Sequence, residues 1–412
     1  MTRSYGNKVQ SNYYDFQTMG QLGCPSSGLA LMAIIHQGIF SQYLRYSKIM
    51  GMKTIKFVCS DARQKQFALA VRKNVTDYFT RNNISIKGNL RLVIQTVVML
   101  CIYIIPFVLL FMVPMNGWVA LLLAVVMGIG MAGIGMCVMH DAVHGSYSKK
   151  EWVNKMLGGT MYLLGSNVFN WKVQHNYLHH AYTNIEGYDE DIASRGPIRL
   201  SQFAPLKKIH HYQYIHAFLF YGLMTISKLI KDFTQLVSFN KSGITRQHHV
   251  NPVAEYIKMV LVKIIYLFIF IGLPILFTPF SWWQVLLGFF VMHWAAGCIL
   301  STVFQMAHVV EGAEQFLPDA DGVVKMEWAV HELHTTSDFA RHNLFLEYYV
   351  GGLNFQIEHH LFPNICHIHY RKIAPIVEKT ATEFGFNYNL KPTFLKAFRS
   401  HVHRLKELSM PL

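Results

Sequence analysis

Three histidine-rich motifs carry most of the chemistry that this sequence can support. They are HDAVH, HNYLHH and QIEHH, and their histidines are His140, His144, His175, His179, His180, His359 and His360. On an α-helix, residues four apart lie on one face, so each HxxxH pair directs two imidazoles toward one point. Because imidazole binds iron, copper, zinc and nickel, the motifs predict a metal site.

The adjacent residues His179 and His180 bear on how many ions the site holds. They point about 100° apart on a helix, so they can serve two metals, or one metal and a bridging neighbour. We interpret the cluster as a site for two ions. The alternative is that these are unrelated capping or surface histidines. That would explain a single HxxxH, but it does not readily explain three such motifs in one chain. The six cysteines are scattered without a CxxC, so they predict neither a thiolate metal site nor a disulfide framework.

Composition indicates which elements position these histidines. Of the 412 residues, 52% are hydrophobic and only 15% are charged, whereas soluble domains average about 25% charged residues. This predicts an integral membrane protein of the all-α class. Four apolar runs are long enough to cross a hydrocarbon core of about 30 Å, and they cover approximately residues 92–113, 118–139, 259–277 and 282–307. The short links 114–117 and 278–281 pair these runs into two hairpins, and glycines in the second run allow a neighbouring helix to approach closely.

The distribution of charge predicts the orientation. Neither link contains Lys or Arg, so all 37 basic residues fall on the other face. The positive-inside rule places that face, and both termini, in the cytoplasm. The net charge of +14 is then explained by orientation and by attraction to anionic headgroups. Nucleic acid binding is not predicted, because no basic stripe with interleaved aromatic residues is present.

Two further apolar runs, 156–169 and 209–227, are interpreted as interfacial helices. If residues 209–227 crossed the membrane, His308 and QIEHH would lie on the opposite side from HDAVH, and no single metal centre could form. With four spans, His140 follows the second span and His308 follows the fourth, at the same surface. The cytoplasmic segments are then 140–258 and 308–408. We expect amphipathic helices from Asp61 and over about 371–384 and 392–408, the last two forming part of a helical cap.

Several polar residues near the motifs are candidates for supporting roles. Asp189 lies in the acidic loop IEGYDEDI, and Asp141 lies inside the first motif; a carboxylate at such a position can orient a ligand histidine through its second ring nitrogen. The alternative is that the acidic loop is a solvated surface loop with no role at the metal site. We interpret four other histidines as structural or supporting, namely His331, His334, His367 and His369, and His293 as a packing residue within a span.

The segments HDAVHGSYS, NWKVQHNYLHHAYTNIEGYDEDI and GGLNFQIEHHLFPNICHIHY together resemble the membrane fatty acid desaturases. The resemblance is to the bacterial acyl-CoA or acyl-lipid branch related to front-end (linoleoyl-CoA type) desaturases, and Gln356 indicates this branch because stearoyl-type relatives have His there. It implies a site for two Fe²⁺ ions with eight histidine ligands: His140, His144, His175, His179, His180, His308, His359 and His360. Gln356 is a supporting candidate. Residues 52–408 would form one desaturase domain, preceded by a disordered extension or an over-long start at 1–51.

The resemblance also implies the reaction and its partners. An unactivated methylene cannot be dehydrogenated by side-chain acids or bases, so O₂ and iron would supply the oxidant. The substrate would be a long-chain acyl-CoA or acyl-lipid, drawn from the lipid of the bacterial inner membrane through an apolar tunnel. The sequence contains no HPGG haem motif of a fused cytochrome b5. Electrons are therefore expected from a separate donor, of ferredoxin or cytochrome b5 type, with its reductase.

Two alternatives remain open at this point. A membrane di-iron hydroxylase of lipids would carry similar histidine motifs, and only its product would differ. A metal transporter or metal store is the non-enzymatic alternative. Transporters place polar ligands near the bilayer midplane in interrupted spans, whereas the three motifs lie outside the predicted spans. This position favours an enzyme.

Overall fold

The computed structural model describes residues 55–194 and 196–411, and this part of the chain is mostly helical. The predicted extension at 1–51 lies outside the described residues. The longer helices are α2 (Ala62–Arg81), α3 (Leu90–Met112), α4 (Gly117–Gly133), α9 (Met224–Lys241), α11 (Pro252–Leu267), α13 (Trp282–His308), α17 (Tyr370–Glu383) and α18 (Phe394–Glu407). The shorter α-helices are α5 (His140–Val143), α6 (Glu151–Gly158), α7 (Val168–Lys172), α8 (Gln213–Tyr221), α10 (Ile244–Gln247), α12 (Leu273–Phe277), α14 (Trp328–Thr335), α15 (Leu344–Tyr349) and α16 (Gln356–Leu361).

Other helical turns and four very short strands complete the described part. The 3₁₀ segments are η3 (Gly159–Leu164), η5 (Lys208–Tyr212) and η7 (His367–His369), and the π-helical segments are η2 (Ile134–Met139), η4 (Val173–His179) and η6 (Phe268–Gly272). The strands form two parallel pairs, β1 (Lys56–Phe57) with β2 (Val323–Val324) and β3 (Asp338–Phe339) with β4 (Leu390–Lys391). These two-residue pairs are the exception to the predicted all-α class.

Four helical stretches are long and apolar enough to cross a membrane: Leu90–Met112, Gly117–Val143, Pro252–Phe277 and Trp282–His308. The prediction of four helical runs with the length and composition of membrane spans is confirmed in number. The third stretch begins earlier than predicted because Asn251 caps α11 by accepting hydrogen bonds from Val253 N and Ala254 N. The run 209–227 is not one continuous helix, since α8 ends at Tyr221 and α9 begins at Met224.

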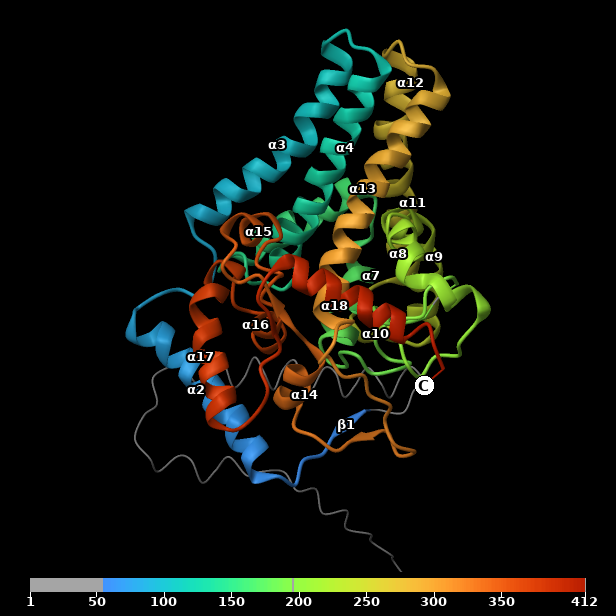
Figure 1. The fold of residues 1–412 in the computed structure, drawn as a ribbon. Helices are drawn as coiled ribbons and strands as arrows, with labels where there is room; N and C mark the ends of the chain where they lie inside the picture. The colour runs from blue at the N-terminus through green and yellow to red at the C-terminus, as the bar shows by residue number, and fades with distance from the viewer. Residues whose placement is uncertain (1–54, 195, 412) are drawn as a thin grey trace, which may run out of the picture. The chain divides into compact units, whose positions relative to one another are not determined.

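Helix α4 packs against both α3 and α13 (Figure 1). Glycine makes both contacts close. A Cβ added to Gly130 would meet the backbone N of Tyr103 on α3 at 2.6 Å, and one added to Gly128 would meet the carbonyl O of Met292 on α13 at 2.5 Å. Close approach of glycine-bearing helices, predicted from the sequence, is therefore observed on both sides of α4.

A second apolar cluster joins α2 and α17 to α14 and α16, below the four long stretches in Figure 1. The amphipathic helix expected from Asp61 is α2: Asp61 caps it by accepting from Arg63 N, and the face with Phe67, Val71 and Val75 is buried. The predicted C-terminal amphipathic helices correspond to α17 and α18. Their packing places α16, with two motif histidines, under the base of the long helices.

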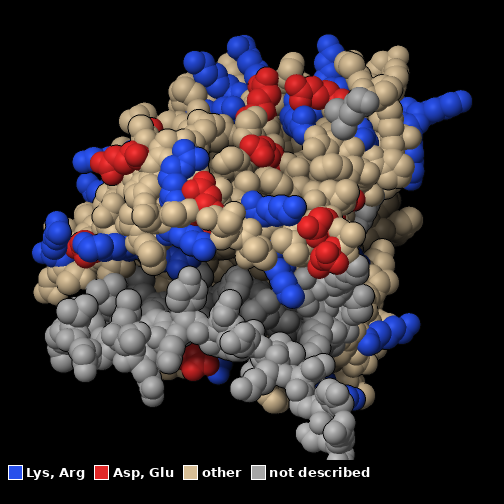
Figure 2. All heavy atoms as spheres, turned by 90° about the horizontal axis from the view of Figure 1, so that it is seen from below, with Lys and Arg blue, Asp and Glu red and all other residues tan. Residues whose placement is uncertain are grey.

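The described surface is charged at the end opposite the links between the long helices. Seen from below, Lys and Arg are spread over it with Asp and Glu interspersed (Figure 2). Neither link, 114–117 or 278–281, contains a charged residue. One end of the helices is therefore suited to an aqueous surface, and the apolar stretches above it are suited to lipid.

Candidate metal centre

Four different elements deliver the eight histidines predicted as ligands to one place. The second long stretch continues from α4 through η2 into α5, where His140 is the first residue and His144 caps the C-terminus. The second motif lies on η4, where His180 N donates to His175 O. This is a π-helical bond, so the predicted α-helical spacing of four does not hold locally. His308 ends α13, and α16 carries His359 and His360.

The first cluster consists of His140, His144, His175 and His359, whose ring nitrogens lie within 4.8 Å of one another. The Nε2 atoms of His140 and His175 are 3.1 Å apart. All four side chains are buried or half-buried. Residues from all three motifs therefore direct nitrogen atoms at one point.

The second cluster consists of His179, His308 and His360. Their ring centroids are 4.8 to 4.9 Å apart in each pair, and all three are buried. His180 lies between the clusters, with its centroid 4.5 Å from that of His359 and 4.4 Å from that of His360. The eight histidines predicted as ligands thus form two adjoining pockets.

The chemistry of these nitrogens fits metal ions. Several buried ring nitrogens in the described structure have no hydrogen-bond partner: His140 Nδ1, His144 Nε2, His180 Nδ1, His308 Nε2, His359 Nε2 and His360 Nε2. Burial, reinforced by the neighbouring rings, lowers the pKa of five histidines well below the ordinary value: His144, His175, His180, His359 and His360. Neutral imidazoles with unused lone pairs are the form that binds a metal, so the pockets suit cations that accept nitrogen ligands.

Asp189 and Glu332 contact the second pocket from outside. Asp189 accepts from His179 Nδ1 at 3.0 Å, and Asp191 Oδ2 lies 3.5 Å from the same nitrogen. Burial disfavours a charge on His179, but these carboxylates outweigh it and raise the pKa of His179 to about 9. Glu332 Oε2 lies 2.8 Å from His360 Nδ1.

Glu332 was not predicted from the sequence. Burial raises its pKa well above the ordinary value for a glutamate, and its described neighbours include no Lys or Arg. His179 and a hydrogen bond from Thr183 favour the ionised form, and a cation in the second pocket would favour it further. Only its position inside VHELH, between His331 and His334, could have drawn attention to it.

The other supporting candidates have different partners. Asp141 Oδ1 lies 4.0 Å from His140 Nδ1, too far for a hydrogen bond. Its Oδ2 instead accepts from His367 Nδ1 at 2.9 Å and from Cys366 Sγ at 3.1 Å. Gln356 interacts with His308, and its Nε2 has no partner among the described residues. Gln356 therefore lies at the second pocket, whereas Asp141 joins the first motif to the segment after the third.

Four other histidines singled out from the sequence bond outside the two pockets. His331 Nε2 donates to Thr183 O at 2.8 Å, His334 Nδ1 donates to Glu314 Oε1 at 2.8 Å, and His369 Nε2 lies 3.2 Å from Lys87 O. His293 lies between the Tyr266 hydroxyl and Thr225. Each of these contacts fits the structural role expected from the sequence.

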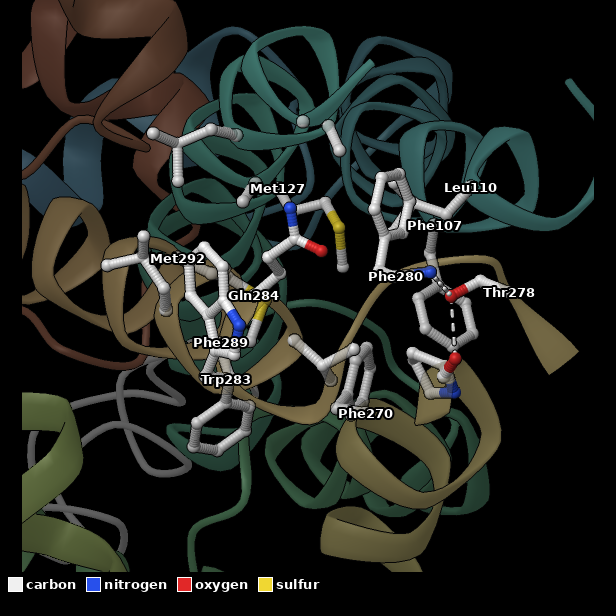
Figure 3. Close-up of a pocket in the computed structure, with 18 of the residues that line it drawn as sticks. Phe107, Leu110, Met127, Phe270, Thr278, Phe280, Trp283, Gln284, Phe289 and Met292 are labelled. Atoms are coloured by element: carbon white, nitrogen blue, oxygen red, sulfur yellow. Dashed lines mark hydrogen bonds between the residues drawn. The ribbon is translucent and has the colours of Figure 1, made fainter. Parts of the chain in front are cut away.

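An apolar cavity of about 380 Å³ lies between α3, α4, α12 and α13, and its lining includes Phe107, Met127, Phe270 and Met292 (Figure 3). It is distant from the histidines, since Met127 precedes His140 by roughly 20 Å along a helix. Buried core residues, among them Met131, Ile134 and Met136, pack between the two. The cavity is therefore distinct from the tunnel to the metal centre expected from the sequence, and that tunnel stays a prediction.

Apolar helices long enough to span a membrane, with buried histidines converging at their base, define a protein equipped for metal-dependent chemistry on a lipid. The family model for fatty acid desaturases matches residues 116–392. The chain belongs to the fatty acid desaturase family and is an oxidoreductase, as the three motifs predicted.

Individual relatives are similar over most of the chain. The sn-1 linoleoyl-lipid 6-desaturase of Arthrospira platensis is 33% identical, over 84% of this chain and 93% of the relative. The acyl-lipid (8-3)-desaturase of Physcomitrium patens is 33% identical, over 85% of this chain and 73% of the relative. The sn-1 linoleoyl-lipid 6-desaturase of Synechocystis sp. is 32% identical, over 87% of this chain and 99% of the relative.

Proposed function

We propose that this chain introduces a cis double bond into a long-chain acyl group of a membrane lipid, between an existing double bond and the carboxyl end. The observation that carries this is the pair of adjoining histidine pockets in a chain of the desaturase family. The relatives named 6-desaturases and (8-3)-desaturases support the front-end position, and their acyl-lipid names favour a lipid-linked substrate over acyl-CoA.

The balanced reaction sets what the site must provide. One –CH₂–CH₂– unit, one O₂, two electrons and two protons give –CH=CH– and two waters. Two bound iron ions would supply the O₂ chemistry that side chains lack. We propose that His140, His144, His175 and His359 hold one ion, that His179, His308 and His360 hold the other, and that His180 serves either. The electrons would come from a separate donor of ferredoxin or cytochrome b5 type with its reductase.

The residues of the chain itself exclude water from the pockets and hold the ligand rings in place. Seven of the eight ligand histidines are buried and His144 is half-buried, so the reacting methylenes would leave water when they reach the pockets. Asp189 and Glu332 fix the ring orientations of His179 and His360. Trp171 stacks on His175 with centroids 4.4 Å apart and holds that ring from one side.

We further propose how the chain lies in the membrane. The first two long stretches form one hairpin and the last two form another, with the links 114–117 and 278–281 on the outer face of a bacterial inner membrane. The histidines and the helices α14, α16, α17 and α18 then form a cap at the cytoplasmic face, with both termini there. The absence of Lys and Arg from both links supports this orientation. We propose that residues 52–408 are the functional domain.

The deciding experiment is the fatty acid profile of a bacterial host that expresses the chain with an electron donor. Cells are supplied with saturated, oleic and linoleic acids in turn, and His179→Ala is compared with the exposed His211→Ala as a matched control. A new double bond that is lost in His179→Ala and kept in His211→Ala supports the proposal, and its position tests the front-end assignment. A hydroxylated product would favour a lipid hydroxylase. No product, despite protein in the membrane and a working donor, would favour metal handling.

A further inference from the structure

Glu332 has the position of a residue that orients a metal ligand. It lies on α14 with its side chain wholly buried. Its Oε2 lies 2.8 Å from His360 Nδ1 and 3.0 Å from Thr183 Oγ1. When His360 donates its Nδ1 proton to this carboxylate, the lone pair is on Nε2, which has no hydrogen-bond partner and faces the other histidines. The hydrogen bond to Glu332, beside a 3.1 Å contact of the same nitrogen with Thr183 Oγ1, therefore selects the tautomer that can bind a metal.

Every histidine of the second pocket has a hydrogen-bond acceptor at its Nδ1 atom. His179 Nδ1 donates to Asp189, and His308 Nδ1 lies 3.3 Å from the carbonyl O of Thr335. Asp189 is itself held in place, because its oxygens also accept from Asn184 N and Asp191 N, each at 2.9 Å. Each ring of this pocket thus has a fixed acceptor behind it, and two of the three acceptors are buried carboxylates.

The first pocket lacks this arrangement. Asp141 lies 4.0 Å from His140 Nδ1, which has no hydrogen-bond partner. His359 Nδ1 faces the neutral hydroxyl of Tyr370 at 3.2 Å, and His175 is held by stacking on Trp171. Within the described structure, no carboxylate accepts a hydrogen bond from any of the four rings. The two pockets therefore differ in the groups behind their ligands, although both are built from histidine.

We infer that Glu332 is a positioning residue which, with Asp189, makes the pocket of His179, His308 and His360 the tighter of the two metal pockets. This pocket takes the first iron ion and releases the last. The physical cause is that a carboxylate behind an imidazole raises its basicity and holds its orientation, and removing such a partner typically lowers metal affinity about 10- to 100-fold. The inference rests on the proposed function in one respect, namely that the histidines bind iron.

The test measures iron release from the full chain, purified in detergent and loaded with ⁵⁷Fe²⁺ without oxygen. A competing chelator is added stepwise, and bound iron per chain is measured by metal analysis. The wild type is expected to lose one ion at low and one at high chelator concentration. His144→Ala, which disrupts the first pocket, should keep only the tightly held ion, and His308→Ala should keep only the weakly held one. The reverse assignment, or two ions of equal affinity, overturns the inference.

The role of Glu332 is tested by Glu332→Gln, with Glu314→Gln as the matched control. Glu314 also accepts from a histidine, His334, at 2.8 Å, but it is exposed and outside both pockets. Glu332→Gln should weaken the tightly held ion about 10- to 100-fold and change one of the two iron signals in the Mössbauer spectrum. Glu314→Gln should change neither.

The outcomes separate this inference from the proposed function. Wild-type release from folded Glu332→Gln overturns the role of Glu332 while leaving the desaturase proposal intact. A wild type that binds no iron overturns both. The comparison of His144→Ala with His308→Ala does not depend on Glu332→Gln, so the order of the two pockets is decided even where that variant does not fold.

Discussion

The rings of His140 and His359 lie 4.5 Å apart between centroids, although they belong to the first and third motifs. A turn before α16 fixes this contact. Gly351 in that turn has a φ of 61°, and a Cβ added to it would meet the carbonyl O of Met136, in η2, at 2.6 Å. The backbone of this turn therefore lies directly against the segment that leads into His140.

Gly351→Ala is expected to disturb the metal centre from outside the ligand set. A left-handed alanine costs about 1–2 kcal/mol, and forcing a methyl group against a packed backbone costs about 1–3 kcal/mol more. We expect lower thermal stability and less bound iron per chain, measured on the purified protein. Gly196→Ala is the control, because Gly196 has a φ of 60° and open space around its Cα. Equal effects of the two substitutions would show that strain alone, without the contact to Met136, accounts for the loss.

The contact between α4 and α13 predicts opposite results for two glycines in the long helices. A Cβ on Gly128 would meet Met292 O at 2.5 Å, whereas one on Gly288 would meet only Ala124 Cβ at 4.0 Å. Gly128→Ala should destabilise by about 1–3 kcal/mol because the helices must separate. Gly288→Ala should be neutral or stabilising by up to about 1 kcal/mol, since alanine favours a helix over glycine. Thermal unfolding of both variants in the same detergent checks this, and destabilisation of similar size at both positions would contradict it.

Particular residues show what the sequence could predict. The four long stretches follow from apolar runs whose length matches a bilayer, and the histidine motifs identify ligand candidates because spacing alone brings several rings together. The contact between Glu332 and Thr183 was not predicted. The two residues are 149 positions apart in the sequence, and a local sequence pattern carries no information about such a contact. The π-helical turn at η4 was missed for a related reason: its extra residue per turn is selected by packing of the second motif against other elements. Asp189 could be proposed as a supporting residue, but that its partner is His179 could be seen only in the folded loop.

The ion pair between Lys263 and Asp232 predicts a test of a buried charge beside a long helix. Lys263 Nζ lies 3.0 Å from Asp232 Oδ2, and both side chains are at least nine-tenths buried. Lys263→Met should destabilise by about 3–5 kcal/mol because Asp232 keeps an uncompensated buried charge. The double variant Lys263→Met with Asp232→Asn should recover part of this loss.

The control for this pair is Lys155→Met. Lys155 pairs with Glu151 at 2.8 Å, but both side chains are at least three-quarters exposed, so the change should cost about 0–1 kcal/mol. Thermal unfolding of the four proteins, wild type and three variants, gives the comparison. A double variant that is no more stable than Lys263→Met alone would show that packing of the Lys263 chain, and not the charge left on Asp232, causes the loss.

His401 on α18 predicts how stability depends on pH. Its Nδ1 donates to Val309 O at 2.7 Å, and its Nε2 accepts from the Tyr221 hydroxyl at 2.9 Å. Burial lowers the pKa of His401 to about 4, whereas an unfolded histidine titrates near 6.5. Between these values the unfolded chain binds a proton that the folded chain does not. The free energy of unfolding should therefore fall as the pH drops from about 6.5 toward 4, by up to about 3 kcal/mol from this residue.

The measurement is the thermal unfolding of wild type, His401→Gln and His403→Gln between pH 7.5 and 5. Other histidines also titrate in this range, so the informative quantity is the difference in slope between the variants. His401→Gln should be less stable at neutral pH, because it loses fitted hydrogen bonds, but should lose less stability on acidification. His403 is exposed and lies on the same helix, so His403→Gln should keep the wild-type slope. If His401→Gln and wild type lose stability in parallel, protonation of His401 does not loosen α18 from α8, and the acid sensitivity of the fold arises at other histidines.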